Sequence, residues 1–200
     1  MGNNLAGKKK YVIISAMEQK LVILGLGNPG EEYENTYHNV GWLALKYMED
    51  EFLGMGVNRK AGKWNNFNYL EFVDDGKKYI LIFPNTYMNL SGKAAIEAIK
   101  VFNIKKEDLI VIHDDSDLPV GEIKGATGVG AAGHNGVSSI IENLGTKDFY
   151  RIRIGIRNPN ETIRKKAEDF VLSKIKKSDM ETFYLTFAGL KSKVNEKSTP

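Results

Sequence analysis

Apolar residues occur along this chain in short continuous runs and in spaced positions, and the changes between the two patterns predict alternating strands and helices. Residues 21–24 and 109–112 are continuous apolar runs, as expected of strands that are buried on both faces of a sheet. Residues 150–156 alternate strictly, with apolar side chains on one face and Arg151, Arg153 and Gly155 on the other. These segments are three predicted strands.

Apolar residues spaced three and four positions apart predict helices between the strands. A helix is expected from about Asn39, with an apolar face made of Val40, Leu43, Ala44, Tyr47, Met48 and Phe52. Ser91 is expected to cap a second helix, and residues 137–144 form a third. Two helices are expected to end the chain, the last beginning with a capping box at 178–181 and keeping its apolar stripe as far as Leu190.

Residues 67–73 and 78–83 flank Asp74-Asp75-Gly76, a hairpin signal that requires antiparallel pairing. The prediction is therefore one α/β domain with a mixed, mostly parallel, twisted sheet flanked by helices. We expect this single domain to span residues 19–195. Residues 1–18 are expected to be an extension that can be disordered, and residues 196–200 a tail.

Composition excludes several classes of site. The chain has 200 residues and no cysteine, so a thiol nucleophile, a cysteine zinc site and disulfides are ruled out. No apolar stretch approaches the roughly 20 residues of a membrane span. Residues 151–200 carry a net charge of +6, against −3 for the rest of the chain. This basic quarter suggests a polyanionic partner, although solvated helix faces would give the same charge.

The stretch LVILGLGNPG, residues 21–30, has the Gly-x-Gly-x-x-Gly spelling of a dinucleotide-binding loop. Such a loop must lead directly into a helix that holds the pyrophosphate, whereas here about ten polar residues intervene. Pro29 also lacks the backbone N–H that a phosphate cradle would use. The dinucleotide interpretation is therefore disfavoured. What remains is a tight turn that leaves Asn28 at the carboxyl end of a strand.

The three histidines lie in motifs that read as loops: TYHNVG, HDDSD and GHNG. Asparagines recur in or near such motifs, and Asp114 follows a predicted strand, so these groups can converge on one cleft. A histidine can serve as general base for water when a carboxylate fixes its tautomer, and asparagine amides can stabilise an oxyanion. The spacing does not suggest a metal site. The implied class is hydrolysis of an activated acyl bond without a covalent intermediate, although separate structural roles for each residue remain open.

Taken together, the motifs resemble those of the bacterial-type peptidyl-tRNA hydrolase family. The matching segments occur in the family's order over about residues 20–190; they are GLGNPGEEYENTYHNVGW, NTYMNLSGKA, HDDSDLPVGEIK, GHNGVSSIIENLG and YRIRIGIRNP. The resemblance implies a single α/β domain that cleaves the ester between a peptide and tRNA, releasing tRNA for reuse. It implies no cofactor and no metal.

The resemblance also implies roles for individual residues. His38 matches the catalytic base, Asp114 the acid that orients it, and Asn28 and Asn89 amides that bind the peptide backbone and acyl carbonyl. Residues expected at the substrate are Tyr33, Met88, His134 and Asn135. Arg153 matches an arginine that holds tRNA phosphate, and Arg151 and Lys124 are expected beside it.

Several positions depart from the family pattern: Tyr37 and Ala126 stand where the family usually has arginine and lysine, and Ala131 and Ala132 replace small or glycine positions before GHNG. A non-catalytic RNA-binding relative is therefore the alternative to an active hydrolase. The expected partner is peptidyl-tRNA, through its acceptor end and its peptide. We expect a monomer that acts in the cytoplasm and does not bind a membrane.

Overall fold

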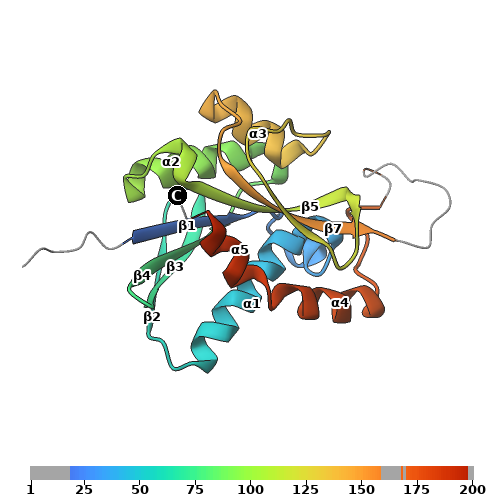
Figure 1. Cartoon of the computed structure of the whole chain (residues 1–200). Helices are drawn as coiled ribbons and strands as arrows, with labels where there is room; N and C mark the ends of the chain where they lie inside the picture. The colour runs from blue at the N-terminus through green and yellow to red at the C-terminus, as the bar shows by residue number, and fades with distance from the viewer. Residues whose placement is uncertain (1–18, 159–167, 169, 198–200) are drawn as a thin grey trace, which may run out of the picture.

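A seven-stranded twisted sheet forms the centre of the protein (Figure 1). The computed structural model describes residues 19–158, 168 and 170–197. The predicted extension 1–18 therefore lies outside the described residues, as does the end of the predicted tail. The strands are β1 (Gln19–Gly25), β2 (Arg59–Lys63), β3 (Phe67–Asp74), β4 (Lys77–Pro84), β5 (Leu109–Pro119), β6 (Ile123–Ala126) and β7 (Tyr150–Arg157).

The sheet is mixed, with a parallel centre. Its order is β2-β3-β4-β1-β5-β7-β6. Strands β4, β1, β5 and β7 are parallel neighbours, whereas β2, β3 and β6 add antiparallel pairs at the two edges. The predicted hairpin is the β3–β4 pair, whose turn places Asp75 and Gly76 at positive φ. The predicted fold class is confirmed.

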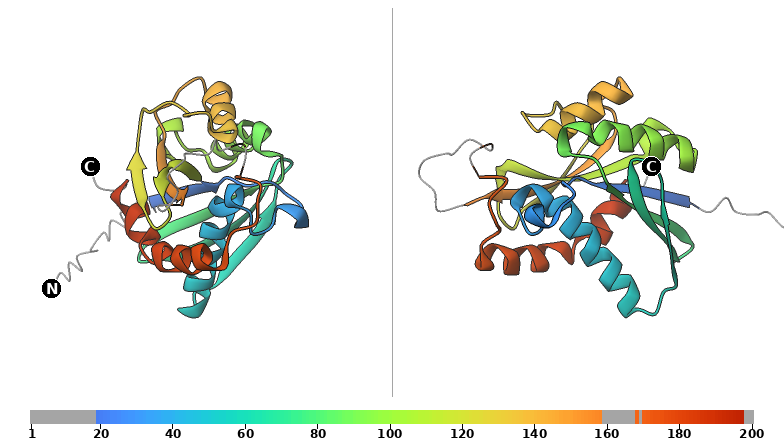
Figure 2. Two further views of the ribbon diagram at one scale, coloured as in Figure 1. Left: turned by 90° about the vertical axis from the view of Figure 1, so that its right-hand side faces the viewer. Right: turned by 180° about the vertical axis from the view of Figure 1, so that it is seen from behind.

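Helices cover both faces of the sheet (Figures 1 and 2). They are α1 (Val40–Gly54), α2 (Ser91–Phe102), α3 (Asn135–Leu144), α4 (Lys177–Phe187) and α5 (Leu190–Glu196). One core cluster joins α1, α4 and α5 to one face, and a second joins α2 and α3 to the other. The central strands are apolar on both faces because each face is covered. None of the described helices combines the length and apolar character that crossing a membrane requires.

Both predicted helix caps are wrong. A 3₁₀ turn (Met88–Leu90) leads directly into α2, so Ser91 lies inside the helix and its hydroxyl donates to the Met88 carbonyl at 2.8 Å. Helix α4 begins at Lys177, so Ser178 comes too late to cap it and contacts Asp179 instead. The last predicted helix is also divided, because α4 ends at Phe187 and α5 begins after Gly189.

Strand β5 continues beyond its apolar run. His113, Asp114 and Asp115 are buried within it, although the sequence HDDSD reads as a turn. The ladder to β7 is irregular between Asp115 and Pro119, where the Asp115 carboxylate accepts a hydrogen bond from the Asp117 N–H. This irregularity lets the strand carry polar residues and still rejoin β7. As a result, two buried carboxylates lie at the carboxyl end of a central strand, where α/β sheets usually bind ligands.

Helix α1 begins in close contact with the central strands. A Cβ atom on Gly41 would lie 2.5 Å from the carbonyl oxygen of Ile112 and 2.6 Å from that of Leu26. These are backbone atoms of the sheet and of the turn that follows β1, so they cannot move aside as a side chain can. Only glycine allows this approach, which places the turn before α1 beside the end of β5.

The Gly41 contact makes a stability prediction. We expect Gly41→Ala to lower the free energy of unfolding by about 1–3 kcal/mol, the usual cost of overpacking. Gly54→Ala is the matched control, because it lies in the same helix and a Cβ there meets nothing within 4 Å. That variant should be unchanged or up to about 1 kcal/mol more stable, because alanine favours helix. Urea unfolding of both variants is the measurement, and equal effects would contradict the packing argument.

Candidate functional site

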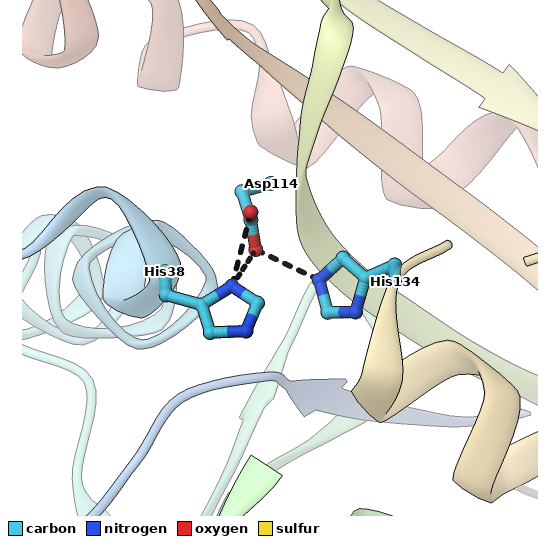
Figure 3. Close-up of side chains that lie close together, drawn as sticks. All are labelled: His38, Asp114 and His134. Atoms are coloured by element: carbon cyan, nitrogen blue, oxygen red, sulfur yellow. Dashed lines mark hydrogen bonds and ion pairs between the residues drawn. The ribbon is translucent and has the colours of Figure 1, made fainter. Parts of the chain in front are cut away.

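Three side chains from distant parts of the sequence meet at the end of β5 (Figure 3). His38 lies in a 3₁₀ turn (Tyr37–Asn39) immediately before α1, Asp114 lies in β5, and His134 precedes the first residue of α3. The His38 and His134 rings are 4.8 Å apart between centroids. The predicted convergence on one cleft therefore occurs for these three side chains, although Asp114 lies in a strand rather than in a loop.

The Asp114 carboxylate fixes the orientation of His38. Its two oxygens lie 3.0 and 3.1 Å from His38 Nδ1, so this nitrogen carries the proton and donates it. His38 Nε2 has no hydrogen-bond partner in the part of the chain that the structure describes, and its lone pair is available. The backbone holds the turn in place, because the His38 N–H donates to the Val171 carbonyl at 2.8 Å.

Burial and pairing act in opposite directions on these groups. Burial alone would lower the pKa of His38, but the Asp114 carboxylate outweighs it and raises that pKa above its ordinary value of 6.5. Burial alone would raise the pKa of Asp114, but the two histidines hold it well below its usual range. Asp114 therefore stays ionised although it is only 3% exposed.

His134 contacts Asp114 and also caps α3. Its Nδ1 accepts hydrogen bonds from the backbone N–H groups of Gly136 at 3.1 Å and Val137 at 3.4 Å. Because Nδ1 is an acceptor, the ring proton must be on Nε2, which donates to Asp114 Oδ1 at 2.8 Å. The motif GHNG indicated a candidate site residue, but nothing in its spacing could reveal this contact with Asp114.

The third histidine is held in the opposite tautomer. His113 is fully buried in β5, and its Nδ1 donates to the Asp114 backbone carbonyl at 2.6 Å. Burial and the neighbouring His134 lower its pKa to about 3. The His113 ring meets the His134 ring edge-on, with centroids 4.9 Å apart. His113 is therefore a neutral wall of the site rather than a base.

His38, Asp114 and His134 could in principle form a metal site, because one possible ligand atom from each lies within 4.8 Å of the others. The hydrogen bonds disfavour this use. For His134 Nε2 to bind a metal, its proton would have to move to Nδ1, where two backbone N–H groups already point. A protonated Nδ1 would then face two donors. The donor set fits a hydrogen-bonded relay better than a metal.

The asparagines form a second part of the site. The Asn28 N–H donates to Asn39 Oδ1 at 2.8 Å, Asn39 Nδ2 donates to the Asn28 carbonyl at 2.9 Å, and Asn28 Oδ1 accepts from the Met88 N–H at 2.7 Å. Asn28 therefore joins the end of β1 to the turns that carry His38 and Met88. Its NH₂ group makes no hydrogen bond to the described residues. Sequence reasoning missed the structural role of Asn39, which only the pairing with Asn28 reveals.

The remaining predicted substrate residues surround these groups. Met88 is buried and lies against Gly136 at the start of α3, and Asn89 is exposed beside it. Tyr33 packs edge-on against Tyr87, with ring centroids 6.3 Å apart. Asn135 is exposed and, with His38 and Asp114, lines a cavity of about 490 Å³. Asn28, Met88 and Asn89 are not in that lining.

The three predicted tRNA contacts are not equivalent. Lys124 and Arg153 are directly paired across β6 and β7, and their side chains are 56% and 25% exposed. Arg153 Nε donates to Asp115 Oδ2 at 2.6 Å. Arg151 shares the strand face of Arg153, as predicted, but it is only 2% exposed, and its Nη2 donates to the Val129 carbonyl in the loop that leads to His134. It therefore offers no surface to a phosphate.

Comparisons with known proteins agree on one family. The sequence model of the family described as peptidyl-tRNA hydrolase matches residues 22–197. The chain is 44% identical over 159 residues to the peptidyl-tRNA hydrolase of Bacillus subtilis, which spans 80% of this chain and 81% of that protein. It is 46% identical over 144 residues to that of Lawsonia intracellularis, spanning 72% and 70%.

Solved structures give the same result. The structure is similar to the peptidyl-tRNA hydrolase of Acinetobacter baumannii, with a TM-score of 0.75, 32% identity, and coverage of 90% of this chain and 89% of the other. It is also similar to the futalosine hydrolase of Helicobacter pylori, with a TM-score of 0.52 at 12% identity. The second similarity is one of fold alone.

The hydrogen bonds predict the tautomers of the histidines. In long-range ¹H–¹⁵N NMR spectra near pH 7, we expect His113 to carry its proton on Nδ1 and His134 on Nε2, because of the partners described above. His113 should stay neutral down to pH 5, whereas His38 should titrate above 6.5. Single substitutions of each histidine assign the signals. A His113 signal that titrates between pH 5 and 8 would contradict its buried, neutral state.

Proposed function

The chain belongs to the peptidyl-tRNA hydrolase family, and we propose that it hydrolyses the ester bond between peptide and tRNA with His38 as the general base. The observation that carries this proposal is the pairing of His38 Nδ1 with the buried Asp114 carboxylate, which leaves Nε2 unpaired among the described residues. A histidine oriented in this way can take a proton from water.

In the proposed reaction, water attacks the ester carbonyl carbon while His38 Nε2 takes its proton. The resulting imidazolium is stabilised by the Asp114 carboxylate, which accepts from Nδ1 at 3.0 Å. When the tetrahedral intermediate collapses, the C–O bond to the ribose breaks. The proton on His38 passes to the leaving ribose oxygen, giving a free peptide acid and tRNA. An ester has a better leaving group than an amide, so no covalent intermediate is required.

The amides are proposed to hold the acyl group and the peptide. The free NH₂ group of Asn28 is a neutral donor for the acyl carbonyl and for the charge that develops on its oxygen. Asn89 is exposed next to Met88 and is proposed to bind the peptide backbone, with Met88 and Tyr33 lining the path. Asn135 lines the cavity beside His134 and is proposed to position water or the terminal ribose.

The edge of the sheet at β6 and β7 is the proposed contact with tRNA phosphates. Lys124 and Arg153 lie side by side there, and Arg153 uses only its Nε in the bond to Asp115. Its two terminal nitrogens can therefore serve a phosphate. The proposal does not include Arg151 as a phosphate ligand, because its side chain is buried.

Every residue in this proposal comes from one chain, so we propose that a monomer is sufficient. Peptidyl-tRNA arises at the ribosome, and the cytoplasm is the proposed place of action. The alternative is a relative that binds RNA without cleaving it. The ionised Asp114 and the unpaired Nε2 of His38 favour catalysis, because pure binding needs neither.

Replacing the base tests the proposal. We expect the wild-type protein to release an N-blocked amino acid from N-blocked aminoacyl-tRNA, and His38→Ala to lower kcat/KM by at least about 100-fold, the low end of general-base contributions. The variant should still bind the tRNA. Binding without cleavage by the wild type would favour the RNA-binding alternative. Full activity of the variant would show that another group is the base.

The pH profile tests the role of Asp114. His38 must be neutral to act as base, so activity falls on the acid side as it protonates. Asp114→Asn removes the charge that raises the His38 pKa and leaves burial, which lowers it. We therefore expect the acid limb of kcat/KM to move to lower pH, and the maximal rate to fall by on the order of 100-fold.

The matched control is Asp108→Asn, which makes the same charge change. Asp108 is exposed and lies immediately before the first residue of β5, at the other end of the strand from Asp114. Its profile should match that of the wild type. An acid limb that is unmoved in Asp114→Asn, or shifted to higher pH, would contradict the assigned pair.

A further inference from the structure

Arg151 is buried in β7 and holds the segment that leads to His134. Its Nη2 donates to the Val129 backbone carbonyl at 2.6 Å. Val129 belongs to residues 127–133, which we call the glycine-rich segment. Arg151 therefore lies beneath this segment rather than on the molecular surface.

The glycine-rich segment has few contacts of its own with the core. Val129 is 40% exposed, and residues 130, 132 and 133 are exposed as well. Gly128, Ala132 and Gly133 have positive φ angles, so the backbone turns sharply before it reaches His134. Apart from Arg151, the described residues outside the segment hold it by the Gly128 N–H bond to the Lys147 carbonyl, by the His134 N–H bond to the Ala131 carbonyl, and by the packing of Ala131 against the core.

The surroundings of Arg151 connect it with the site. The positive charge of Arg151 contributes to the lowered pKa of His113, which is neutral and carries its proton on Nδ1. Two of the buried side-chain atoms that have no hydrogen-bond partner among the described residues belong to this region: Arg151 Nε, which is a donor, and His113 Nε2, which is an acceptor. The His113 ring packs edge-on against His134. Arg151 thus lies close to two walls of the site, the glycine-rich segment and His113.

We infer that Arg151 is a positioning residue for the hydrolytic site: by holding the Val129 carbonyl it fixes the glycine-rich segment, and through it the His134 ring that donates to Asp114. This inference rests on the proposed function. The chain of contacts runs from Arg151 to Val129, along the backbone to His134, and from His134 Nε2 to Asp114 Oδ1 at 2.8 Å. Asp114 in turn orients His38.

The inference makes a kinetic distinction. A displaced His134 would disturb the Asp114–His38 pair in every bound complex, so the loss should appear in kcat. A phosphate ligand would instead affect binding: its removal should raise KM and reduce the slope of log affinity against log salt by about 0.7–0.9. The two roles of Arg151 can therefore be separated by experiment.

The test compares Arg151→Met with Arg151→Lys in the full chain. For Arg151→Met we expect kcat to fall about 10-fold, because small misplacements far from the chemistry are costly, while KM stays within about 2-fold and the salt slope does not change. Arg151→Lys should recover at least about a third of the lost kcat, because its ammonium group can reach the same carbonyl. Arg59→Met is the matched control at the opposite sheet edge and should keep wild-type kinetics.

The outcomes are distinct. An increased KM with a reduced salt slope would assign Arg151 to phosphate binding, and a lower melting temperature with unchanged kcat would leave it a purely structural role. Either result overturns the inference. An inactive wild-type protein would instead contradict the proposed function.

A measurement on the wild-type protein covers the case in which Arg151→Met does not fold. Phenylglyoxal modification, read by mass spectrometry, should leave Arg151 unmodified with or without tRNA. Modification of Arg151 that tRNA prevents would overturn the inference.

Discussion

The site is organised around one buried carboxylate. Asp114 is ionised and almost fully buried, and a charge in such a place is tolerated only when donors surround it. Two imidazoles supply those donors from opposite sides, His38 from the turn before α1 and His134 from the start of α3. Both helices must therefore begin where they do, or the carboxylate would be left unpaired. The same requirement that stabilises the fold at this point also fixes the His38 ring, whose Nε2 is unpaired among the described residues.

The sheet topology makes this convergence possible. Strands β4, β1 and β5 are parallel neighbours, so the turns that follow them leave from one edge. Asn28 joins the segments that follow β1 and β4 through its hydrogen bonds to Asn39 and the Met88 backbone. The Gly-x-Gly-x-x-Gly spelling of the first turn has a packing role in this structure. Its glycines allow close packing, as at Gly27, where a Cβ atom would meet the Trp42 ring.

Much of the fold could be predicted because it follows local patterns. The apolar run at 21–24, the spaced apolar face of α1 and the hairpin at Asp74–Gly76 each identify an element without knowledge of its neighbours. Strand β2 was missed because it is short, exposed and polar, so its sequence shows neither the alternation of a strand nor the apolar spacing of a helix. The length of β5 was missed because His113, Asp114 and Asp115 are buried only through partners far away in the sequence.

The three residues that meet at Asp114 could be named from the sequence, but their connections could not. The motifs predicted His38, Asp114 and His134, and the structure brings them together, yet the cap that His134 forms depends on the exact start of α3. Arg151 shows the limit most clearly. Strand alternation correctly places it on the same face as Arg153, but alternation cannot reveal that the glycine-rich segment covers one arginine and leaves the other partly open.

The cap formed by His134 restricts which side chains this position can accept. An asparagine could offer an oxygen near the position of Nδ1 and so preserve the first turn of α3, but it is too short to reach Asp114. A glutamine could place a donor near the position of Nε2, but it would lose the acceptor for the Gly136 and Val137 amides. Only the imidazole ring performs both tasks at once. Substitution here therefore separates the stability of α3 from the support of Asp114. Such a variant can keep one of the two functions only by losing the other.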